Sequence, residues 1–524
     1  MRGPFDIAIV GSGFAGSLMA MIARRLGCSV VMIERGRHPR FVIGESSTPL
    51  ADLLWGELAR RYDLPRLLPL NKWGSWQRAY PQIGCGLKRG FTFFHHTFGQ
   101  PFLDDARRRH QLLVAASASD EFADTHWYRP EFDHFLVQEA QRMGVEYLDE
   151  TRLDRAEVGP AVSRLSGVRG GGEMALEARL VIDASGPRGF LHRALGLPER
   201  RFDHLPPTQA LYSHFTGVGR FADLACFPRS EAPPYPPDDA AVHHVFPGGW
   251  IWVLRFNNGI TSAGVAATDT LAAELDLAEG APAWRRLLER LPAVQEHFAT
   301  AQSILPFVHA PRLPFRSGAI AGPGWVLLPY AAGFIDPLLS TGFPLTLLGI
   351  GRLAGTLEEG VPALRAPGRL EAYARHTESE LLAAEQLVGA LYNNMCDFPS
   401  FSVLALLYFA AASFAENARR LGRPELAGGF LLHDHPRFGP ALKRCCALAL
   451  EAAPGSGASP GQRDALRAAV LEAIEPVDVI GLSRADRRNW FPVDPQESAK
   501  AALKLGMAPA AEPARSWTQP DAPA

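Results

Sequence analysis

A glycine-rich turn near the N-terminus is the first part of the sequence with residue types and spacing suited to chemistry. Residues 11–16 (GSGFAG) have the spacing GxGxxG. Gly11 would allow a tight turn, Gly13 a close approach of backbone N–H groups to a pyrophosphate, and Gly16 close helix–strand packing. Glu34 follows about 20 residues later, where a carboxylate can accept a hydrogen bond from a ribose hydroxyl. The pattern predicts a dinucleotide site, with these contacts: Gly11, Gly13, Ala15, Gly16 and Glu34.

The segments around this turn have the order needed to position it. Residues 5–10 are a mostly apolar run typical of a strand, residues 11–26 have helical spacing, and residues 28–34 form a second apolar run. A strand, a helix and a strand in this order begin a parallel, doubly wound sheet, so we predict an α/β fold with a Rossmann-type cofactor domain. This context disfavours a turn that binds nothing, while NAD and FAD both stay open as ligands.

Two later segments favour FAD. Residues 181–186 (VIDASG) run from a strand into a small-residue turn, and residues 324–342 contain a strand, a small-residue turn and an Asp-Pro pair that begins at Asp336. Both resemble FAD contacts of the class A flavin monooxygenase fold, which implies that Asp336 contacts the cofactor. That fold usually has Gly-Asp where this chain has Pro329 and Tyr330, so one carboxylate near the ribityl chain is missing.

Three segments, taken in order, narrow the class of protein. Residues 38–49 (HPRFVIGESSTP) follow the second strand, residues 249–254 (GWIWVL) carry a WxW pair, and residues 334–342 (FIDPLLSTG) lie at the expected flavin ring. Together they resemble the flavin-dependent halogenases, particularly the bacterial branch that acts on phenols and other small free aromatics. The resemblance extends from the N-terminus to about residue 350 and is weaker beyond it.

The resemblance implies a reaction and its residues. Reduced FAD, oxygen and chloride or bromide would give hypohalous acid, which a lysine would then direct onto an electron-rich ring. Lys88 occupies the place of that lysine; without the resemblance, an ordinary solvated side chain would be expected there. Thr341 and Gly342 would bind the halide through backbone N–H groups at a helix N-terminus. Further implied cofactor contacts are Arg129 (otherwise a surface arginine at a helix start), Asp336, Gly342 and Phe343.

The resemblance also implies partners. The chain has one dinucleotide fingerprint, which predicts a separate NAD(P)H-dependent flavin reductase, although class A monooxygenases bind NAD(P)H without a second Rossmann unit. The substrate would be a small aromatic compound. Leu339 stands where tryptophan-specific members have a glutamate, which argues against tryptophan.

Two other functions stay open. The family signature is usually WxWxIP, and here Leu254 and Arg255 replace Ile-Pro. Because that motif is thought to keep substrate away from the flavin, the alternative is a halogenase-like FAD monooxygenase or oxidoreductase that incorporates no halide. A flavin-binding protein without catalysis is the third hypothesis, and the intact glycines, Glu34 and Lys88 disfavour it.

Composition excludes several classes of partner and ligand. The 524 residues carry a formal net charge of −2, which gives no reason to expect nucleic acid. Six cysteines without a CxxC pair predict a reduced, cytoplasmic protein, and histidine pairs without a third ligand predict no metal site. Residues 401–414 are apolar but rich in small residues, so we expect a buried helix and no membrane association.

The chain divides into three predicted regions. Residues 1–370 would form a discontinuous FAD-binding domain with an inserted mixed sheet as the substrate floor. Residues 371–508 would be mainly helical, and residues 509–524, rich in Ala and Pro, would form a disordered tail. The segment from residue 44 to residue 103 is rich in Gly, Pro and aromatic residues, which predicts loops and short strands.

Overall fold

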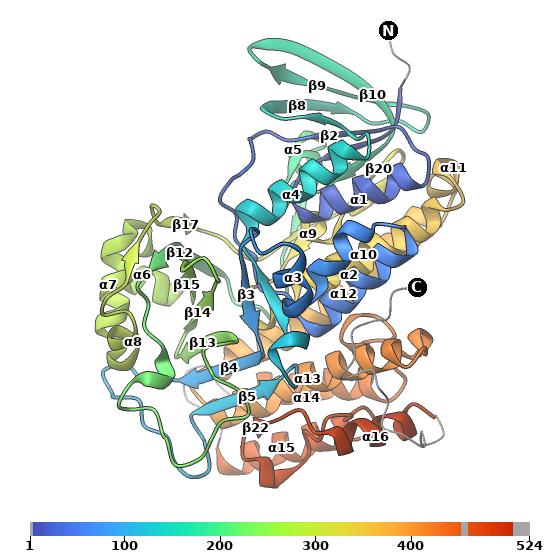
Figure 1. The fold of residues 1–524 in the computed structure, drawn as a ribbon. Coiled ribbons are helices and arrows are strands. Elements are labelled where there is room, and N and C mark those ends of the chain that lie inside the picture. The colour runs from blue at the N-terminus through green and yellow to red at the C-terminus, as the bar shows by residue number, and fades with distance from the viewer. Residues whose placement is uncertain (1–3, 452–458, 507–524) are drawn as a thin grey trace.

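The computed structural model describes residues 4–451 and 459–506; the predicted tail at 509–524 lies outside them. A first sheet with its helices lies at the top of Figure 1, a second sheet lies at the lower left, and the C-terminal helices lie at the bottom. The helices are α1 (Phe14–Arg25), α2 (Pro49–Arg61), α3 (Trp73–Ala79), α4 (Arg129–Arg142), α5 (Phe190–Ala194), α6 (Asp269–Glu274), α7 (Ala281–Glu289), α8 (Pro292–His297), α9 (Pro329–Ala332), α10 (Gly342–Leu357), α11 (Val361–Leu364), α12 (Arg369–Asn393), α13 (Phe398–Arg420), α14 (Phe438–Leu450), α15 (Pro460–Ile474) and α16 (Pro495–Lys504).

The first sheet confirms the predicted α/β fold. Its centre consists of parallel pairs that join β10 to β1, β1 to β2 and β2 to β7, and β20 extends it in parallel beyond β10. An antiparallel meander of β8, β9 and β10 projects from it. Its strands are β1 (Phe5–Val10), β2 (Val30–Ile33), β7 (Glu146–Leu148), β8 (Thr151–Glu157), β9 (Ser163–Arg169), β10 (Gly172–Asp183), β19 (Ala321–Gly322) and β20 (Trp325–Leu327).

The second sheet contains both parallel and antiparallel pairs, as predicted for the sheet that forms the floor of the substrate region. Most of its pairs are antiparallel, while β4 runs parallel to β13 and β22 parallel to β5. Its strands are β4 (Gly90–His95), β5 (Gln111–Ala115), β12 (Thr208–Thr216), β13 (Ala241–Phe246), β14 (Gly249–Arg255), β15 (Thr261–Thr268), β16 (Gln302–Ser303), β17 (Val308–Ala310) and β22 (Trp490–Phe491). Because β22 comes from near residue 490, the C-terminal region completes the edge of this sheet.

Two smaller sheets connect these layers. β3 (Cys85–Lys88) pairs antiparallel with β6 (Asp124–Trp127), and β18 (Phe315–Ser317) lies between β11 (Glu199–Arg200) and β21 (Gly333–Phe334). The β3–β6 ribbon runs down from the first sheet toward β4 (Figure 1). It is the element that brings Lys88 between the two main sheets.

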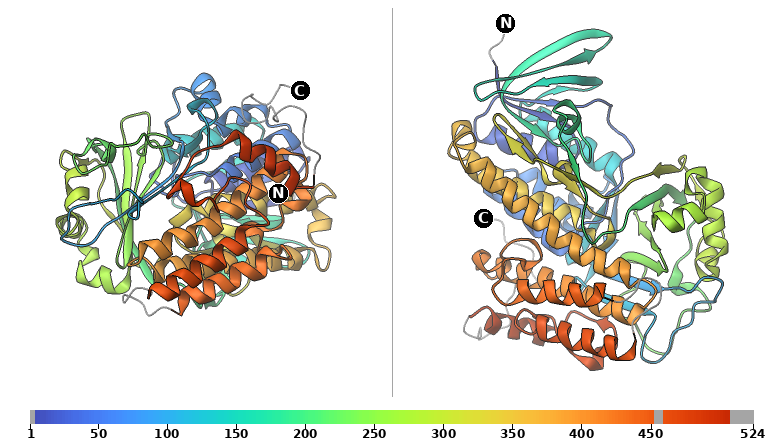
Figure 2. Two further views of the ribbon diagram at one scale, coloured as in Figure 1. Left: turned by 90° about the horizontal axis from the view of Figure 1, so that it is seen from below. Right: turned by 180° about the vertical axis from the view of Figure 1, so that it is seen from behind.

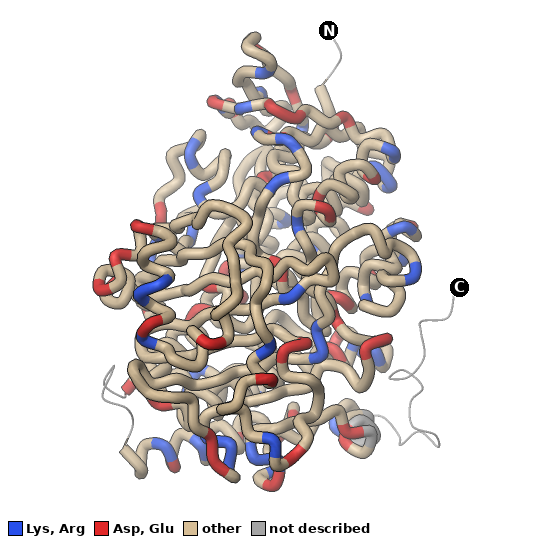
Figure 3. Tube along the Cα trace, turned by 60° about the vertical axis from the view of Figure 1, so that its left-hand side comes forward, with Lys and Arg blue, Asp and Glu red and all other residues tan. Residues whose placement is uncertain are grey.

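The C-terminal region is mainly helical, as expected. In the view from behind, α12 runs diagonally from the first sheet to the layered helices α13, α14 and α15 (Figure 2). Two helical segments, Leu338–Leu357 and Phe398–Arg420, are long and apolar enough to cross a membrane by length and composition, and 67% and 83% of their most apolar windows are buried inside the protein. Lys and Arg residues are interspersed with Asp and Glu over the face in Figure 3.

One secondary-structure prediction was wrong. The segment predicted as loops and short strands contains the 13-residue helix α2, which begins at Pro49. Thr48 accepts a hydrogen bond from the Ala51 N–H at 3.2 Å and caps the helix. A threonine followed by proline is a helix-start signal that the composition of the segment obscured.

Candidate active site

A cleft of about 1000 Å³ lies along the carboxyl ends of β1, β2 and β10. The glycine turn, the end of β2 and the turn after β10 meet there, as a doubly wound sheet requires of a ligand site. Of the predicted cofactor contacts, six line this cleft: Gly11, Gly13, Ala15, Glu34, Arg129 and Phe343.

Two glycines of the turn, Gly11 and Gly16, leave room only for backbone. Gly11 has φ +102°, and a Cβ on it would lie 2.6 Å from the Ala184 carbonyl oxygen. A Cβ on Gly16 would lie 2.0 Å from the Gly11 carbonyl oxygen, so Gly16 serves close packing and not the cleft wall. Gly13 is the N-cap of α1, and no side chain in the described chain caps that end, which leaves N–H donors facing the cleft. This cradle fits a pyrophosphate at a helix N-terminus.

Glu34 is held as a carboxylate at the end of β2. It accepts hydrogen bonds from the Ser12 N–H at 3.2 Å and the Gly36 N–H at 3.0 Å, and it pairs with Arg40 at 3.2 Å. Burial opposes its ionisation, but Arg40 and these donors outweigh burial and lower the Glu34 pKa. An ionised acceptor at this place fits a ribose hydroxyl.

Arg129 is a buried side chain and not a surface arginine. Two of its nitrogens donate to Asp133, each at 2.8 Å, and a third donates to the Gly44 carbonyl oxygen at 2.8 Å. Burial would lower the Arg129 pKa, but the charge of Asp133 raises it. Arg129 therefore brings a fixed guanidinium to the cleft wall, with its charge balanced by Asp133.

Asp336 is hydrogen-bonded to other residues of this chain. The cofactor contact that the family resemblance implies for it does not require these bonds. It accepts hydrogen bonds from Trp250 Nε1 at 3.2 Å, from the Tyr392 hydroxyl at 2.8 Å and from the Leu338 N–H. Burial raises its pKa to about 7 against these donors. The first tryptophan of the WxW pair thus holds Asp336, while the second, Trp252, lines the cleft. A direct contact of Asp336 with FAD stays a prediction.

The turn before α10 has unusual backbone geometry. Leu339 and Ser340 have φ of 64° and 54°, a region that non-glycine residues seldom adopt and that is often found at functional sites. Thr341 is the N-cap of α10, without a side-chain cap among the described residues. Thr341 and Gly342 line a hollow of about 10 Å³ beside the cleft residue Tyr330. A space of that size holds about one water-sized occupant.

Lys88 lies in a second, closed region. It is fully buried at the end of β3, and its Nζ donates to Ser46 Oγ at 2.8 Å and to the Ser47 carbonyl oxygen. The same Nζ lies 3.8 Å from the centroid of the Phe91 ring. Burial lowers the Lys88 pKa to about 7, although Asp124 and Asp52 act to raise it. The sequence alone favoured a solvated lysine, and the structure excludes that interpretation.

A short strap, residues 44–47, joins the two regions. The Gly44 carbonyl oxygen contacts Arg129 in the cleft, and Ser46 and Ser47 contact Lys88. Two residues of extended chain span at most ~7 Å, so the strap places Lys88 near the cleft wall. β6 fixes its path through Glu45 and Ser47, because the Trp127 N–H donates to the Glu45 carbonyl at 2.7 Å and the Ser47 N–H to the Thr125 carbonyl at 3.1 Å.

A small pocket of about 60 Å³ adjoins Lys88 through Phe91. Three aromatic residues line it, namely Phe91, Tyr408 and Phe409, and Glu416 lies on its wall. Other aromatic side chains belong to the buried core: Phe93, Phe94, Tyr392, Phe398 and Phe401.

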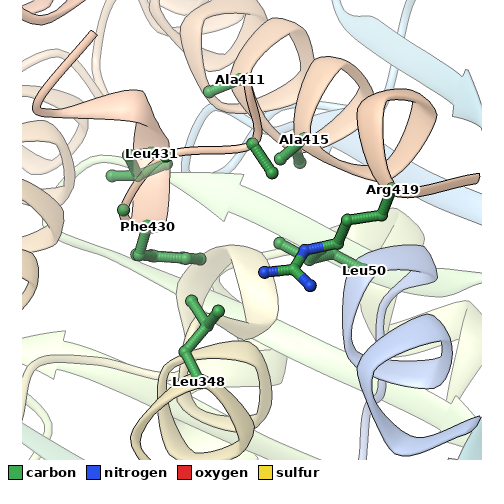
Figure 4. A pocket seen from close by; sticks show the side chains of 11 residues that line it. Leu50, Leu348, Ala411, Ala415, Arg419, Phe430 and Leu431 are labelled. Carbon is green, nitrogen blue, oxygen red and sulfur yellow. The ribbon is translucent and has the colours of Figure 1, made fainter. Parts of the chain in front are cut away.

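A neighbouring face of α13 borders a different hollow (Figure 4). Ala411 and Ala415 from α13, Leu50 from α2 and Leu348 from α10 surround it, with Arg419 at its side. It measures about 10 Å³, and Arg419 is paired with Glu57 at 2.7 Å. Its lining is apolar apart from this paired arginine, which indicates a gap between packed helices.

Sequence reasoning missed several residues at the centre of the site. Glu45 lies in the noted GES segment, and its Oε1 contacts His214 Nε2 at 2.8 Å with both side chains buried. Asp52 and Asp124 lie beside Lys88, and Lys72 pairs with Asp124; these three residues come from separate segments. An acid in an unrecognised helix carries no motif, so only the fold could reveal this group. Among the described residues, no cluster of three or more His, Cys, Asp or Glu side chains could hold a metal ion.

Comparisons with known proteins agree with this geometry. Residues 117–396 match the tryptophan halogenase family model. The chain is 31% identical to monodechloroaminopyrrolnitrin halogenase PrnC of Pseudomonas fluorescens over 407 residues, which are 75% of this chain and 69% of that protein. It is 28% identical to tetracycline 7-halogenase of Kitasatospora aureofaciens over 419 residues, 78% of this chain and 73% of the relative.

A solved structure extends the agreement to the fold. Halogenase PltM in complex with phloroglucinol and FAD superimposes with a TM-score of 0.82 at 25% identity, over 92% of this chain and 99% of PltM. The likeness therefore includes the helical C-terminal region, where the sequence resemblance was weak. The chain belongs to the flavin-dependent halogenase family and is an FAD-dependent enzyme of the oxidoreductase class.

Proposed function

We propose that the protein chlorinates or brominates a small phenolic or similar electron-rich aromatic compound, with Lys88 as the residue that passes the halogen to the ring. The observation that carries the proposal is the fully buried Lys88 amine, held between the strap of the FAD cleft and the ring of Phe91, which also lines the aromatic pocket. A lysine confined in this way meets one small reactant at a time and is shielded from bulk water.

The cleft residues would hold FAD by their backbone and charge. The N-terminus of α1, which no side chain in the described part of the chain caps, would face the pyrophosphate. Glu34 would face the ribose, and the Arg129 guanidinium would face negative charge further along the cofactor. When bound in its reduced form, FAD would supply with oxygen the oxidising equivalents that convert halide into hypohalous acid. Thr341 and Gly342, beside a hollow sized for one small occupant, are the proposed halide contacts.

Lys88 would act on the hypohalous acid either as a neutral amine or as a charged ammonium. The neutral amine takes the halogen, forming an N–X bond and releasing water; transfer of X to the ring then restores the amine as the ring loses a proton. The ammonium form would instead donate a hydrogen bond to the acid's oxygen. A pKa near 7 makes both forms accessible at neutral pH.

The pocket beside Phe91 supports a small aromatic substrate. Its walls are apolar and aromatic, with Glu416 as a polar group able to accept a hydrogen bond from a ring hydroxyl. PltM, crystallised with phloroglucinol, and PrnC and tetracycline 7-halogenase are all named as halogenases. Leu339, buried where a tryptophan-specific member has a glutamate, supports a phenol over tryptophan.

The proposal includes partners, location and domain organisation. A separate NAD(P)H-dependent flavin reductase would supply reduced FAD. Six free cysteines support a reduced, cytoplasmic setting. We retain residues 1–370 and 371–508 as the two structural regions, with β22 and the pocket joining them.

One assay tests this function. The enzyme is given reduced FAD, oxygen, a panel of phenols, and chloride or bromide, and the products are identified by mass spectrometry. We expect halogenated phenol that disappears in Lys88→Ala while FAD binding persists. Hydroxylated product without halide dependence would overturn the proposal in favour of a monooxygenase, and persistent reduced flavin would point to a non-catalytic flavin-binding protein.

A further inference from the structure

Two buried aspartates lie beside Lys88 on separate elements. Asp124 is the register partner of Lys88 across the β3–β6 ribbon, and Asp52 comes from α2. Both are completely buried. Lys72 donates from Nζ to Asp124 Oδ1 at 2.7 Å, and the Ser47 hydroxyl donates to Asp52 Oδ1.

The remaining oxygen of each aspartate needs a hydrogen-bond donor. The two carboxyl groups contact each other, and in the described part of the chain the Oδ2 atom of each lacks any donor. Buried carboxylate oxygens need donors, and two like charges in contact cannot both stay ionised at low cost. A single proton shared by Asp52 and Asp124 would supply a donor to this pair of carboxyl groups and remove the repulsion.

With one proton shared, the charges around Lys88 balance. The aspartate pair carries a single negative charge, and Lys72, with a side chain that is 18% exposed, carries one positive charge. The other titratable groups that face this centre are His126 on β6, His243 on β13 and Tyr408 on α13. Burial lowers the pKa of both histidines and raises that of Tyr408, so all three are uncharged at neutral pH.

We propose that Asp52 and Asp124 share one proton and, together with Lys72, form a charge-balanced group that leaves Lys88 free to gain or lose its own proton. Lys72, Asp52 and Asp124 are then positioning residues that act through the charge state of Lys88. The inference rests on the proposed function and deepens it, because a Lys88 that exchanges its proton near neutral pH can act in either of the two forms given there, the neutral amine or the ammonium.

The lysine content of the chain permits a direct test. It has only five lysines, at positions 72, 88, 443, 500 and 504. Protein labelled with ¹³C at lysine Cε therefore gives few NMR signals, and the loss of one signal in Lys88→Met assigns Lys88. Titration of that signal reports the Lys88 charge without any turnover.

Two substitutions should affect the Lys88 midpoint differently: one should shift it and the other should leave it nearly unchanged. In Lys72→Met the aspartate pair keeps a negative charge without a counter-ion, so the Lys88 titration should move upward by about one pH unit or more. In Asp52→Asn an amide replaces the protonated acid without changing the total charge, so the Lys88 midpoint should move by less than about 0.3 units. Lys72→Arg, which keeps the positive charge, should restore the wild-type midpoint.

Each result decides the inference. A downward shift in Asp52→Asn would mean that both aspartates are ionised, and an unchanged midpoint in Lys72→Met would mean that Lys72 does not balance them; either overturns the proposal. Asp52→Asn tests it alone if Lys72→Met does not fold. The pH–rate profile for halogenation should shift in parallel with the NMR midpoint. Expected NMR shifts without halogenated product would overturn the proposed function and leave the charge-balanced group in place.

Discussion

The cofactor cleft and the Lys88 centre are built in different ways. The cleft depends largely on backbone: Gly11 and Gly16, which leave no room for a Cβ, and a helix N-terminus without a side-chain cap in the described residues. The Lys88 centre depends on side chains that converge from the strap, α2, β3, β4 and β6. Backbone recognition leaves a compact motif in the sequence, whereas convergent side chains become visible only in the fold.

The largest effect should come from removing the Lys88 amine. We expect Lys88→Met to lower the rate of halogenated product by at least about 10³-fold, the scale of a lost proton-transfer or nucleophilic group. FAD affinity, measured by flavin fluorescence, should not change because the cleft does not use this side chain. Lys443→Met, an exposed lysine on α14, is the matched control. If Lys88→Met formed halogenated product near the wild-type rate, the assignment of halogen transfer to the Lys88 centre would be wrong.

Gly16→Ala should produce the converse effect in the cleft. The added Cβ would lie 2.0 Å from the Gly11 carbonyl oxygen, so the turn must open. We expect FAD binding to weaken by at least about 100-fold, which corresponds to ~2.7 kcal/mol. Gly461→Ala, where a Cβ meets nothing within 4 Å, is the control. Unchanged FAD affinity would contradict the backbone-built site; circular dichroism separates loss of binding from unfolding.

More of the cofactor cleft than of the Lys88 centre could be predicted from the sequence. The βαβ beginning, the glycine turn and Glu34 follow from local patterns that set both the backbone and its ligand. Lys88 came from resemblance alone, and its partners could not be predicted because Asp52 lies in a helix interpreted as loop and Asp124 in a strand with no motif. Asp336 shows the limit of resemblance, since its hydrogen bonds to Trp250 and Tyr392 depend on β14 and α12 meeting in space.

As the pH falls, the Lys88 centre should lose stability at a higher pH than the cofactor cleft does. Burial lowers the His243 pKa to about 3, from an ordinary value of 6.5. Above pH 6.5 the folded and unfolded chains both hold neutral His243; below it only the unfolded chain gains the proton, so stability falls as the pH drops from 6.5 toward 3. His243→Phe, which keeps an aromatic ring against Phe93, should remove ~1.4 kcal/mol per pH unit of this dependence.

Urea unfolding at pH 7.5 and pH 5.0 measures the His243 contribution. The exposed His376→Phe is the control, and it should keep the wild-type pH dependence. An equal pH dependence in His243→Phe and wild type would show that this histidine is not held neutral. Ion pairs in the cleft, such as Glu34 with Arg40, should persist over the same range because the Glu34 pKa is lowered.

The smallest effect should come from Glu416, on the wall of the pocket beside Phe91. Its carboxylate accepts a hydrogen bond from Arg420 Nε at 2.9 Å, which holds it in place. Glu416→Gln should raise KM for a phenol about fivefold, the scale of ~1 kcal/mol for a weakened hydrogen bond, with little change in kcat. KM for the matching methyl ether, which has no hydroxyl to donate, should not change. The exposed Glu425→Gln is the control. If both substrates lose affinity equally, Glu416 shapes the pocket and does not recognise the hydroxyl, and selectivity at the Lys88 centre would then depend on the aromatic walls alone.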